Sequence, residues 1–266
     1  MSEPETMRVE HVEPATLLVT LNRPERLNAQ TNQMFGELEE LGLSLRARPN
    51  VRAVIFTGAG RAFSAGFDLD EAEELETDGA LGMLRRQELA ARAMHAVRAI
   101  PVPVIAAVNG PAAGGGLALA LAADIRLAAP TARLGAAFVR IGLSAGDLGT
   151  SWLVPRLIGY GRAAEILFSG RLIEAEEAER IGLVNAIHAA DELLPAALAM
   201  AAAIAANSPG GVKLSKRALQ ANMEVGSYAA ALELENRGQA LLTRTDDMRE
   251  ALAAFKAHRE PQFADR

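Results

Sequence analysis

The chain has 266 residues, of which 50% are hydrophobic and 23% are charged, and its formal net charge is -6. This length permits one large domain or two smaller ones with a substantial core. The acidic balance argues against a nucleic-acid-binding protein, which usually carries a basic surface. There are no cysteines, which excludes disulfides and thiolate chemistry. The four histidines are scattered without the spacing of metal ligands, so we expect no metal site.

No apolar run reaches the roughly 18–20 residues that a membrane-spanning helix needs. The acidic opening Met1-Ser2-Glu3-Pro4-Glu5 is unlike a signal peptide. We therefore expect a cytoplasmic protein without a membrane partner. The lack of cysteine agrees with a reducing compartment.

Strand patterns alternate with helical patterns along the first two thirds of the chain. We predict strands at 17–21, 51–57, 103–108 and 124–128 and helices at 31–46 and 81–99, with a further helix from the glycine triplet at 114–116. Thr31 is the predicted N-cap of the first helix. This alternation predicts an α/β fold with largely parallel strands. From Asp191 onward only helical patterns follow, so we expect a core domain at 1–190 and a C-terminal helical region at 191–266.

Two glycine-bearing loops each follow a predicted strand, the first at 61–69 and the second at 109–117. Glycine lets the backbone approach a ligand, and a helix N-terminus offers unpaired N–H groups. Such a junction can hold a phosphate or an oxygen that becomes negative during a reaction, or it can simply be a tight turn with close helix–sheet packing. The second loop lacks the Lys-Ser/Thr of a P-loop, no G-x-G-x-x-G follows the first strand, and Ser64 does not stand in G-x-S-x-G.

In order and spacing, these loops resemble the enoyl-CoA hydratase/isomerase (crotonase) family. The resemblance also includes Leu21-Asn22-Arg23-Pro24, Ala122-Ala123-Asp124-Ile125-Arg126 and Ser208-Pro209, and it covers the chain from about Leu17 to Phe263. It implies an α/β spiral of ββα units whose C-terminal helical region helps to build homotrimers, often paired as dimers of trimers. It also implies that the ligand is an acyl-CoA thioester, with coenzyme A as part of the substrate and no separate cofactor.

The resemblance implies a set of site residues as well. The thioester oxygen is expected between the backbone N–H groups of Phe67 and Gly115, which form an oxyanion hole. Further contacts with the substrate or its CoA portion are expected from Arg26, Ser64, Ala65, Asp68, Leu69, Gly114, Phe138 and Lys256, the last acting in its own or in a neighbouring subunit. Asp68 has a second interpretation, as the N-cap of a helix that begins with Leu69.

The two acid/base glutamates of the family's hydratases have no counterpart, because Ala118 and Phe138 stand at those positions and neither side chain can move a proton. Asp147 lies in the loop 142–150, which lines the acyl pocket in relatives. It is either a general acid/base with a raised pKa or the cap of a helix that begins near Leu148. A single carboxylate favours double-bond isomerisation over hydration. Two alternatives stay open: a non-catalytic acyl-CoA-binding paralogue, and a CoA-thioester hydrolase or lyase that uses Asp147.

Overall fold

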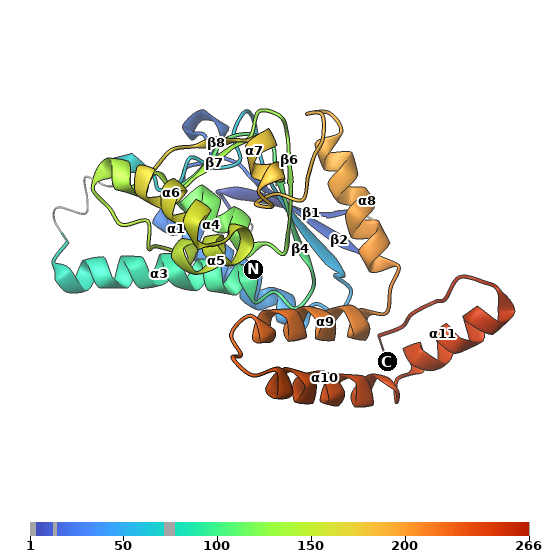
Figure 1. Cartoon of the computed structure of the whole chain (residues 1–266). Helices are drawn as coiled ribbons and strands as arrows, with labels where there is room; N and C mark the ends of the chain where they lie inside the picture. The colour runs from blue at the N-terminus through green and yellow to red at the C-terminus, as the bar shows by residue number, and fades with distance from the viewer. Residues whose placement is uncertain (1–3, 13–14, 72–77, 266) are drawn as a thin grey trace.

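The computed structural model describes residues 4–12, 15–71 and 78–265. Its centre is a six-stranded sheet in the order β1-β2-β3-β4-β6-β9 (Figure 1). These strands are β1 (Met7–Val12), β2 (Thr16–Leu21), β3 (Ala53–Gly58), β4 (Val104–Val108), β6 (Ile125–Ala128) and β9 (Ala186–Ile187). All neighbours pair in parallel except β1, which is antiparallel to β2. A second sheet joins β5 (Ala112–Ala113), β7 (Arg133–Gly135) and β8 (Ile173–Glu174).

Helices cover both faces of the larger sheet. The helices of the core are α1 (Asn32–Ser44), α3 (Ala80–Arg98), α4 (Gly115–Ala122), α5 (Thr150–Ile158), α6 (Tyr160–Ser169), α7 (Ala175–Arg180) and α8 (Leu193–Ala205), with the 3₁₀ turns η1 (Pro24–Arg26), η2 (Leu45–Ala47) and η3 (Ala137–Ile141). On β2, Leu17 and Val19 point into the main core, which α1, α3 and α4 share, and Leu18 points to the opposite face, which α8 covers. This burial on both faces explains why the parallel strands are continuous apolar runs.

The predicted alternation of strands and helices is confirmed. The first predicted helix begins after Thr31, whose Oγ1 accepts the backbone N–H of Met34 as an N-cap should. The edge strand β1 and the short strands of the smaller sheet were not predicted, because they are brief or half exposed and carry a weak pattern.

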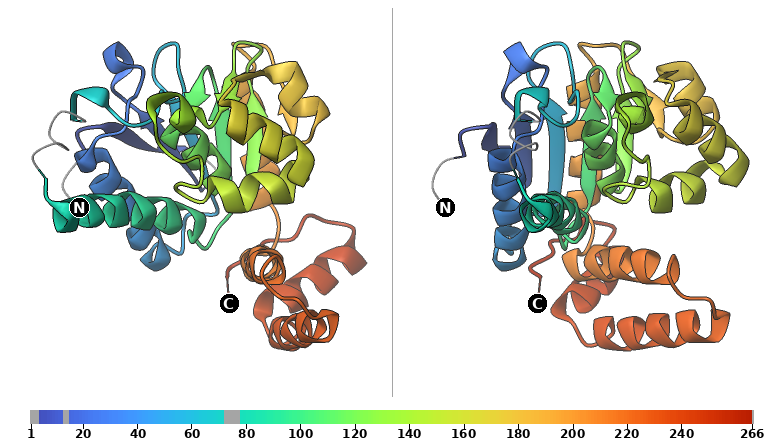
Figure 2. Two further views of the ribbon diagram at one scale, coloured as in Figure 1. Left: turned by 60° about the vertical axis from the view of Figure 1, so that its left-hand side comes forward. Right: turned by 90° about the vertical axis from the view of Figure 1, so that its left-hand side faces the viewer.

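Three helices follow the core and extend away from the sheet (Figure 2). They are α9 (Pro209–Asn222), α10 (Tyr228–Leu242) and α11 (Asp246–Ala257). After Asp191 the described residues contain no strand, in agreement with the sequence pattern. Helix α8 packs on the sheet, whereas α10 has no buried residue. The predicted helical region at 191–266 therefore consists of one helix of the core and three that stand apart from it.

A partly buried ion pair joins α9 to the core. Lys216 Nζ lies 2.6 Å from Asp124 Oδ2 and donates to the carbonyl oxygen of Val102 at 2.9 Å. The same Asp124 oxygen accepts the backbone N–H of Val104, at the start of β4. Burial lowers the pKa of the Lys216 ammonium, and the attraction of Asp124 acts in the opposite direction. The helical extension is thus held to the central sheet at a specific point.

Large apolar side chains are exposed on the three C-terminal helices. Tyr228 and Phe255 are each 80% exposed, and Leu241 is 68% exposed. No single helix in the described part of the chain is long and apolar enough to cross a membrane. Helices α8 and α9 pass that test only as a pair, and they are bent by 108° to each other.

Candidate active site

A pocket of about 580 Å³ opens beside the two glycine-bearing loops. Its walls come from the segment 25–35, the first loop, the N-terminus of α4, helix α3 and the segment 137–148. Both predicted oxyanion residues, Phe67 and Gly115, line it, and so does Asp147. Segments that are far apart in the sequence therefore meet at one cavity.

The first loop is held against the second by backbone contacts. Ser64 forms an isolated parallel bridge with Ala112, and the N–H of Ala113 donates to the Ser64 carbonyl oxygen at 3.1 Å. Gly66 has a φ of +95°, and a Cβ there would lie 2.6 Å from the Ala113 carbonyl oxygen and 3.2 Å from the Gly115 nitrogen. Only glycine fits this conformation and this approach, so Gly66 lets the two loops come together.

The glycine triplet places the N-terminus of α4 at the pocket. Gly114 has a φ of +53°, and its N–H donates to the carbonyl oxygen of Gly135 at 2.9 Å. A Cβ on Gly115 would lie 2.2 Å from Gln30 Oε1, and a Cβ on Gly116 would lie 2.1 Å from the Ser64 carbonyl oxygen. Side chains at the second and third glycines would therefore push the helix away from the first loop.

Within the described residues, the backbone N–H groups of Phe67 and Gly115 donate to no protein acceptor. Their neighbours are paired: the N–H of Asp68 donates to the Gln30 carbonyl oxygen at 2.9 Å, and the N–H of Gly66 donates to Ser64 Oγ at 3.3 Å. Buried N–H groups are rarely left unpaired in proteins. Two such donors at one cavity have the character of an anion-binding or oxyanion-binding site.

Gln30 contacts both loops and was not predicted from the sequence. Its backbone N–H donates to the Gly66 carbonyl oxygen at 2.7 Å, and its side-chain Nε2 donates to the Gly115 carbonyl oxygen at 3.1 Å. The residue is fully buried, and its Oε1 accepts no hydrogen bond from the described residues. The sequence signal for this residue was its position directly after Leu27-Asn28-Ala29 and directly before the predicted cap Thr31.

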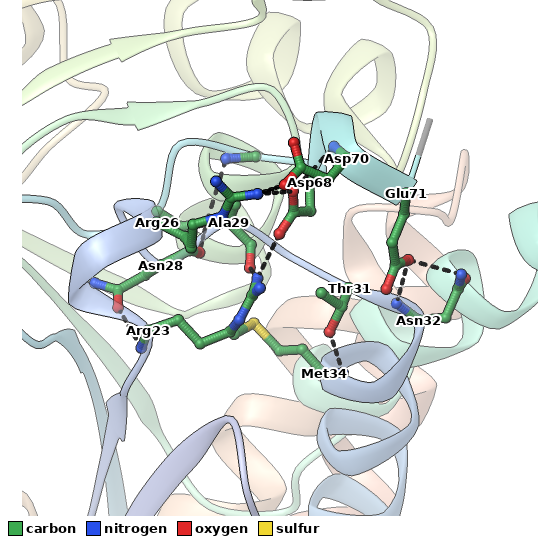
Figure 3. Close-up of polar contacts among 12 residues, drawn as sticks. Arg23, Arg26, Asn28, Ala29, Thr31, Asn32, Met34, Asp68, Asp70 and Glu71 are labelled. Carbon is green, nitrogen blue, oxygen red and sulfur yellow. Dashed lines mark hydrogen bonds and ion pairs between the residues drawn. The ribbon is translucent and has the colours of Figure 1, made fainter. Parts of the chain in front are cut away.

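Asp68 is the centre of an ion-pair network at the edge of the pocket (Figure 3). Its Oδ2 lies 2.7 Å from Arg23 Nη1, and its Oδ1 lies 3.8 Å from Arg26 Nη2. The same Oδ1 accepts the N–H of Asp70 at 3.1 Å, and a helical turn begins at Leu69. The predicted N-cap role of Asp68 is thus confirmed, and its carboxylate is largely engaged within the protein.

The structure brings most of the other predicted contact residues to the pocket. The pocket is lined by Arg26, Ala65, Asp68, Leu69, Gly114 and Phe138. Ser64 is buried behind the surface, where its hydroxyl donates to the Asn28 carbonyl oxygen at 2.8 Å. Lys256 is exposed on α11 and does not line the pocket of its own chain, so its predicted role requires an adjacent subunit.

The two positions of the missing glutamates are apolar and buried. Ala118 lies inside α4, and the Phe138 ring covers Gly114, where a Cβ would lie 3.5 Å from the ring. Asp147, in the segment 137–148 that also contains Phe138, lines the pocket. Its Oδ1 accepts a hydrogen bond from Gln87 Nε2 and a second from the backbone N–H of Leu148 at 2.8 Å.

Burial raises the pKa of the Asp147 carboxyl group, and the hydrogen bonds from Gln87 and the Leu148 N–H offset part of this rise. The alternative role of Asp147 as a helix cap is wrong. Helix α5 begins at Thr150 with Gly149 as its N-cap, and no side chain caps it. Asp147 is therefore a half-buried carboxyl group that faces a cavity, which is a common setting for a group that transfers protons. No cluster of three or more His, Cys, Asp or Glu side chains in the described residues could hold a metal ion.

The chain belongs to the enoyl-CoA hydratase/isomerase family, whose model matches residues 12–266. A Mycobacterium bovis protein named "Probable enoyl-CoA hydratase echA12" is 43% identical over 97% of this chain and 92% of its own length. The 1,2-epoxyphenylacetyl-CoA isomerase of Escherichia coli is 37% identical over 95% of this chain and 96% of its own length. The crystal structure of an enoyl-CoA hydratase from Bacillus anthracis is similar with a TM-score of 0.93, at 34% identity, covering 98% of this chain and all of that one.

Proposed function

We propose that this protein binds an acyl-CoA thioester and moves a proton along its acyl chain through an enolate. The observation that carries the proposal is the pair of unpaired N–H groups, of Phe67 and Gly115, at the cavity that Asp147 also lines. Donors aimed at a developing enolate oxygen stabilise the transition state more than the ground state. Each such donor is typically worth about 2.7–4 kcal/mol of barrier.

In this proposal Asp147 is the general acid/base. The ionised carboxylate removes a proton from the carbon next to the thioester carbonyl, and the negative charge moves to the thioester oxygen between the two N–H groups. The carboxylic acid then returns the proton to another carbon of the conjugated system. One group performs both transfers, so the reaction is an isomerisation. Hydration needs a second group to activate water, and the two glutamate positions are occupied by Ala118 and Phe138.

The names of the relatives support an acyl-CoA substrate, and both hydration and isomerisation occur among those names. One is named as a hydratase, and another is named as an isomerase of an aryl acyl-CoA. The ring of Phe138 on the pocket wall supports a bulky, apolar acyl group. We infer isomerisation as the main activity for this chain because it has one carboxylate where hydratases of the family use two.

The test is turnover of a panel of enoyl-, dienoyl- and aryl-acetyl-CoA thioesters by the wild type and by Asp147→Asn. Because proton transfer by a positioned group contributes roughly 100- to 10,000-fold, the variant is expected to lose at least 100-fold in kcat and to bind the thioester nearly as well. Glu88→Gln, on the exposed side of α3, is the matched control and is expected to keep wild-type activity. Unchanged turnover in Asp147→Asn rejects the role of Asp147.

Two other functions are distinguished by the same panel. If every thioester binds and mass spectrometry detects no product, the protein is the non-catalytic acyl-CoA-binding paralogue. Release of free CoA, measured with a thiol reagent, indicates the hydrolase or lyase that uses Asp147 as its nucleophile. Shifted double bonds with intact thioester support the isomerase.

We further propose that the chain assembles as a homotrimer or a dimer of trimers through α9, α10 and α11. The exposed apolar side chains of these helices, among them Tyr228, Leu241 and Phe255, support an interface there. In such an assembly Lys256 is expected to approach the CoA phosphates of an adjacent subunit. Light scattering coupled to size-exclusion chromatography tests the stoichiometry, and a monomer at micromolar concentration contradicts it.

A further inference from the structure

A side-chain hydrogen bond joins two segments of the chain that line the pocket. Gln87 projects from α3, and Asp147 lies in the segment between η3 and α5, 60 positions further along the chain. Gln87 Nε2 donates to Asp147 Oδ1, and both residues line the cavity. The link therefore lies beside the proposed path of the substrate proton.

The two oxygens of the Asp147 carboxyl group are not equivalent. Oδ1 accepts both the Gln87 amide and the backbone N–H of Leu148 at 2.8 Å, whereas Oδ2 accepts no hydrogen bond from the described residues. An oxygen that already accepts two N–H donors is a weaker proton acceptor than its free partner, because its lone pairs are engaged. The free oxygen is thus the better base.

We propose that Gln87 is a positioning residue that holds the Asp147 carboxyl group so that Oδ2 alone takes and returns the substrate proton. This inference rests on the proposed function. Leu148 holds the same carboxylate oxygen from the backbone of the Asp147 loop, and Gln87 holds it from the facing helix. With Oδ1 fixed from both sides, the carboxyl group cannot turn to exchange its two oxygens without breaking a hydrogen bond.

The proton balance of the step is simple. A C–H bond of the acyl chain breaks, an O–H bond forms at Oδ2, and the electron pair becomes the enolate on the thioester oxygen. In the return step the O–H bond breaks, a C–H bond forms at a different carbon, and the carboxylate is regenerated. No oxidant, reductant or further reactant takes part.

Within the described residues, Gln87 is the side chain whose contact lowers the pKa of the Asp147 carboxyl group. Arg26 and Asp70 pair with each other at the pocket edge, and Arg86 on α3 pairs with Asp78. The other charged side chains of the lining, among the described residues, are Glu25, Arg61 and Asp68. Burial raises the pKa of the Asp147 carboxyl group, and the hydrogen bonds from Gln87 and the Leu148 N–H lower it.

The experiment compares Gln87→Leu and Gln87→Met with the wild type and with Glu88→Gln, the exposed neighbour on α3. Both Gln87 variants remove the donor and keep a side chain of similar length on a helix surface, so folding is expected to persist and is checked by circular dichroism. The expected result is a loss of 10-fold or more in kcat with KM changed less than about threefold. The acidic limb of the kcat–pH profile is expected to move to higher pH, because the ionised form of Asp147 has lost a donor.

A second readout does not depend on turnover. The pKa of Asp147 is measured by carbon-13 NMR of carboxyl-labelled protein, with Asp147→Asn used to assign the signal, and it is expected to rise in both Gln87 variants and to stay unchanged in Glu88→Gln. An unchanged Asp147 pKa in the Gln87 variants overturns this inference, as does a fall in kcat without any shift of the pH profile. Absence of turnover in the wild type with every thioester overturns the proposed function instead, so the two failures are distinguishable.

Discussion

The side-chain Nε2 of Gln30 donates a hydrogen bond of 3.1 Å to the carbonyl oxygen of Gly115. Through its backbone, Gln30 also accepts the N–H of Asp68 and donates to the carbonyl oxygen of Gly66. These two residues flank Phe67 in the chain. One residue therefore contacts both halves of the proposed oxyanion hole and sets the separation of the two donors.

Replacement of Gln30 by leucine tests this relationship. The variant loses the hydrogen bond to Gly115 and also the buried Oε1, which accepts no hydrogen bond from the described residues, so the two effects on the free energy of unfolding nearly cancel, to within about 1 kcal/mol. Activity is expected to fall roughly 10-fold, because the Gly115 N–H loses its support. Chemical denaturation measures the change in stability, and steady-state kinetics measures the loss of activity. Equal losses of stability and activity contradict a positioning role.

Gly115→Ala is expected to damage catalysis through its Cβ. That atom would lie 2.2 Å from Gln30 Oε1, so either Gln30 or the start of α4 must shift and misplace the N–H donor. Loss of one such donor corresponds to roughly a 100- to 1,000-fold lower kcat. Gly36→Ala is the matched control, since a Cβ at that helical position meets nothing within 4 Å. This control is expected to keep its activity and to gain about 0.4–1 kcal/mol of stability.

The raised pKa of Asp147 predicts a particular pH dependence. The carboxylate must be ionised to accept a proton, so kcat/KM is expected to fall as the pH drops through a pKa above the usual range of aspartate. The contribution of Asp147 to the stability of the fold changes with pH in the opposite direction to its contribution to kcat/KM. A carboxyl group with a raised pKa in the folded state stabilises the fold when protonated, and this contribution is lost as the pH rises through that pKa.

Asp147→Asn, which is neutral at every pH, is therefore expected to be at least as stable as the wild type at neutral pH while it loses turnover. Thermal unfolding at several pH values and a pH–rate profile measure the two effects. A variant that is clearly less stable at neutral pH contradicts the assignment of a raised pKa.

Lys216→Met is expected to destabilise the fold by roughly 3 kcal/mol, because it leaves Asp124 without its buried cation between α9 and the sheet. The matched control is Lys213→Met on the same helix. Lys213 pairs with Asp265, and both side chains of that pair are 27% exposed, so a loss of at most about 1 kcal/mol is expected. Urea denaturation followed by circular dichroism compares the two variants. Equal effects on the free energy of unfolding contradict the anchoring role of Lys216.

The sequence by itself determined the strand–helix alternation, the Thr31 cap, the Asp68 cap and the two glycine-bearing loops. These features follow from periodicity, capping and backbone freedom, which depend on neighbouring residues in the chain. The proposed donors, Phe67 and Gly115, came from the resemblance to the enoyl-CoA hydratase/isomerase family, and the glycines at 66 and 114–116 permit the close approach of the two loops.

The tertiary structure alone decided which polar side chains support those donors and the carboxylate. Gln30 reaches Gly115 across 85 positions of the chain, and Gln87 reaches Asp147 across 60. A glutamine carries no local signal for such a contact, since its partner is set by the packing of α1, α3 and α4 around the pocket. The same packing decided between the two interpretations of Asp147. Only the folded chain shows that α5 begins at Thr150 and that the Asp147 carboxylate accepts a hydrogen bond from Gln87 on α3.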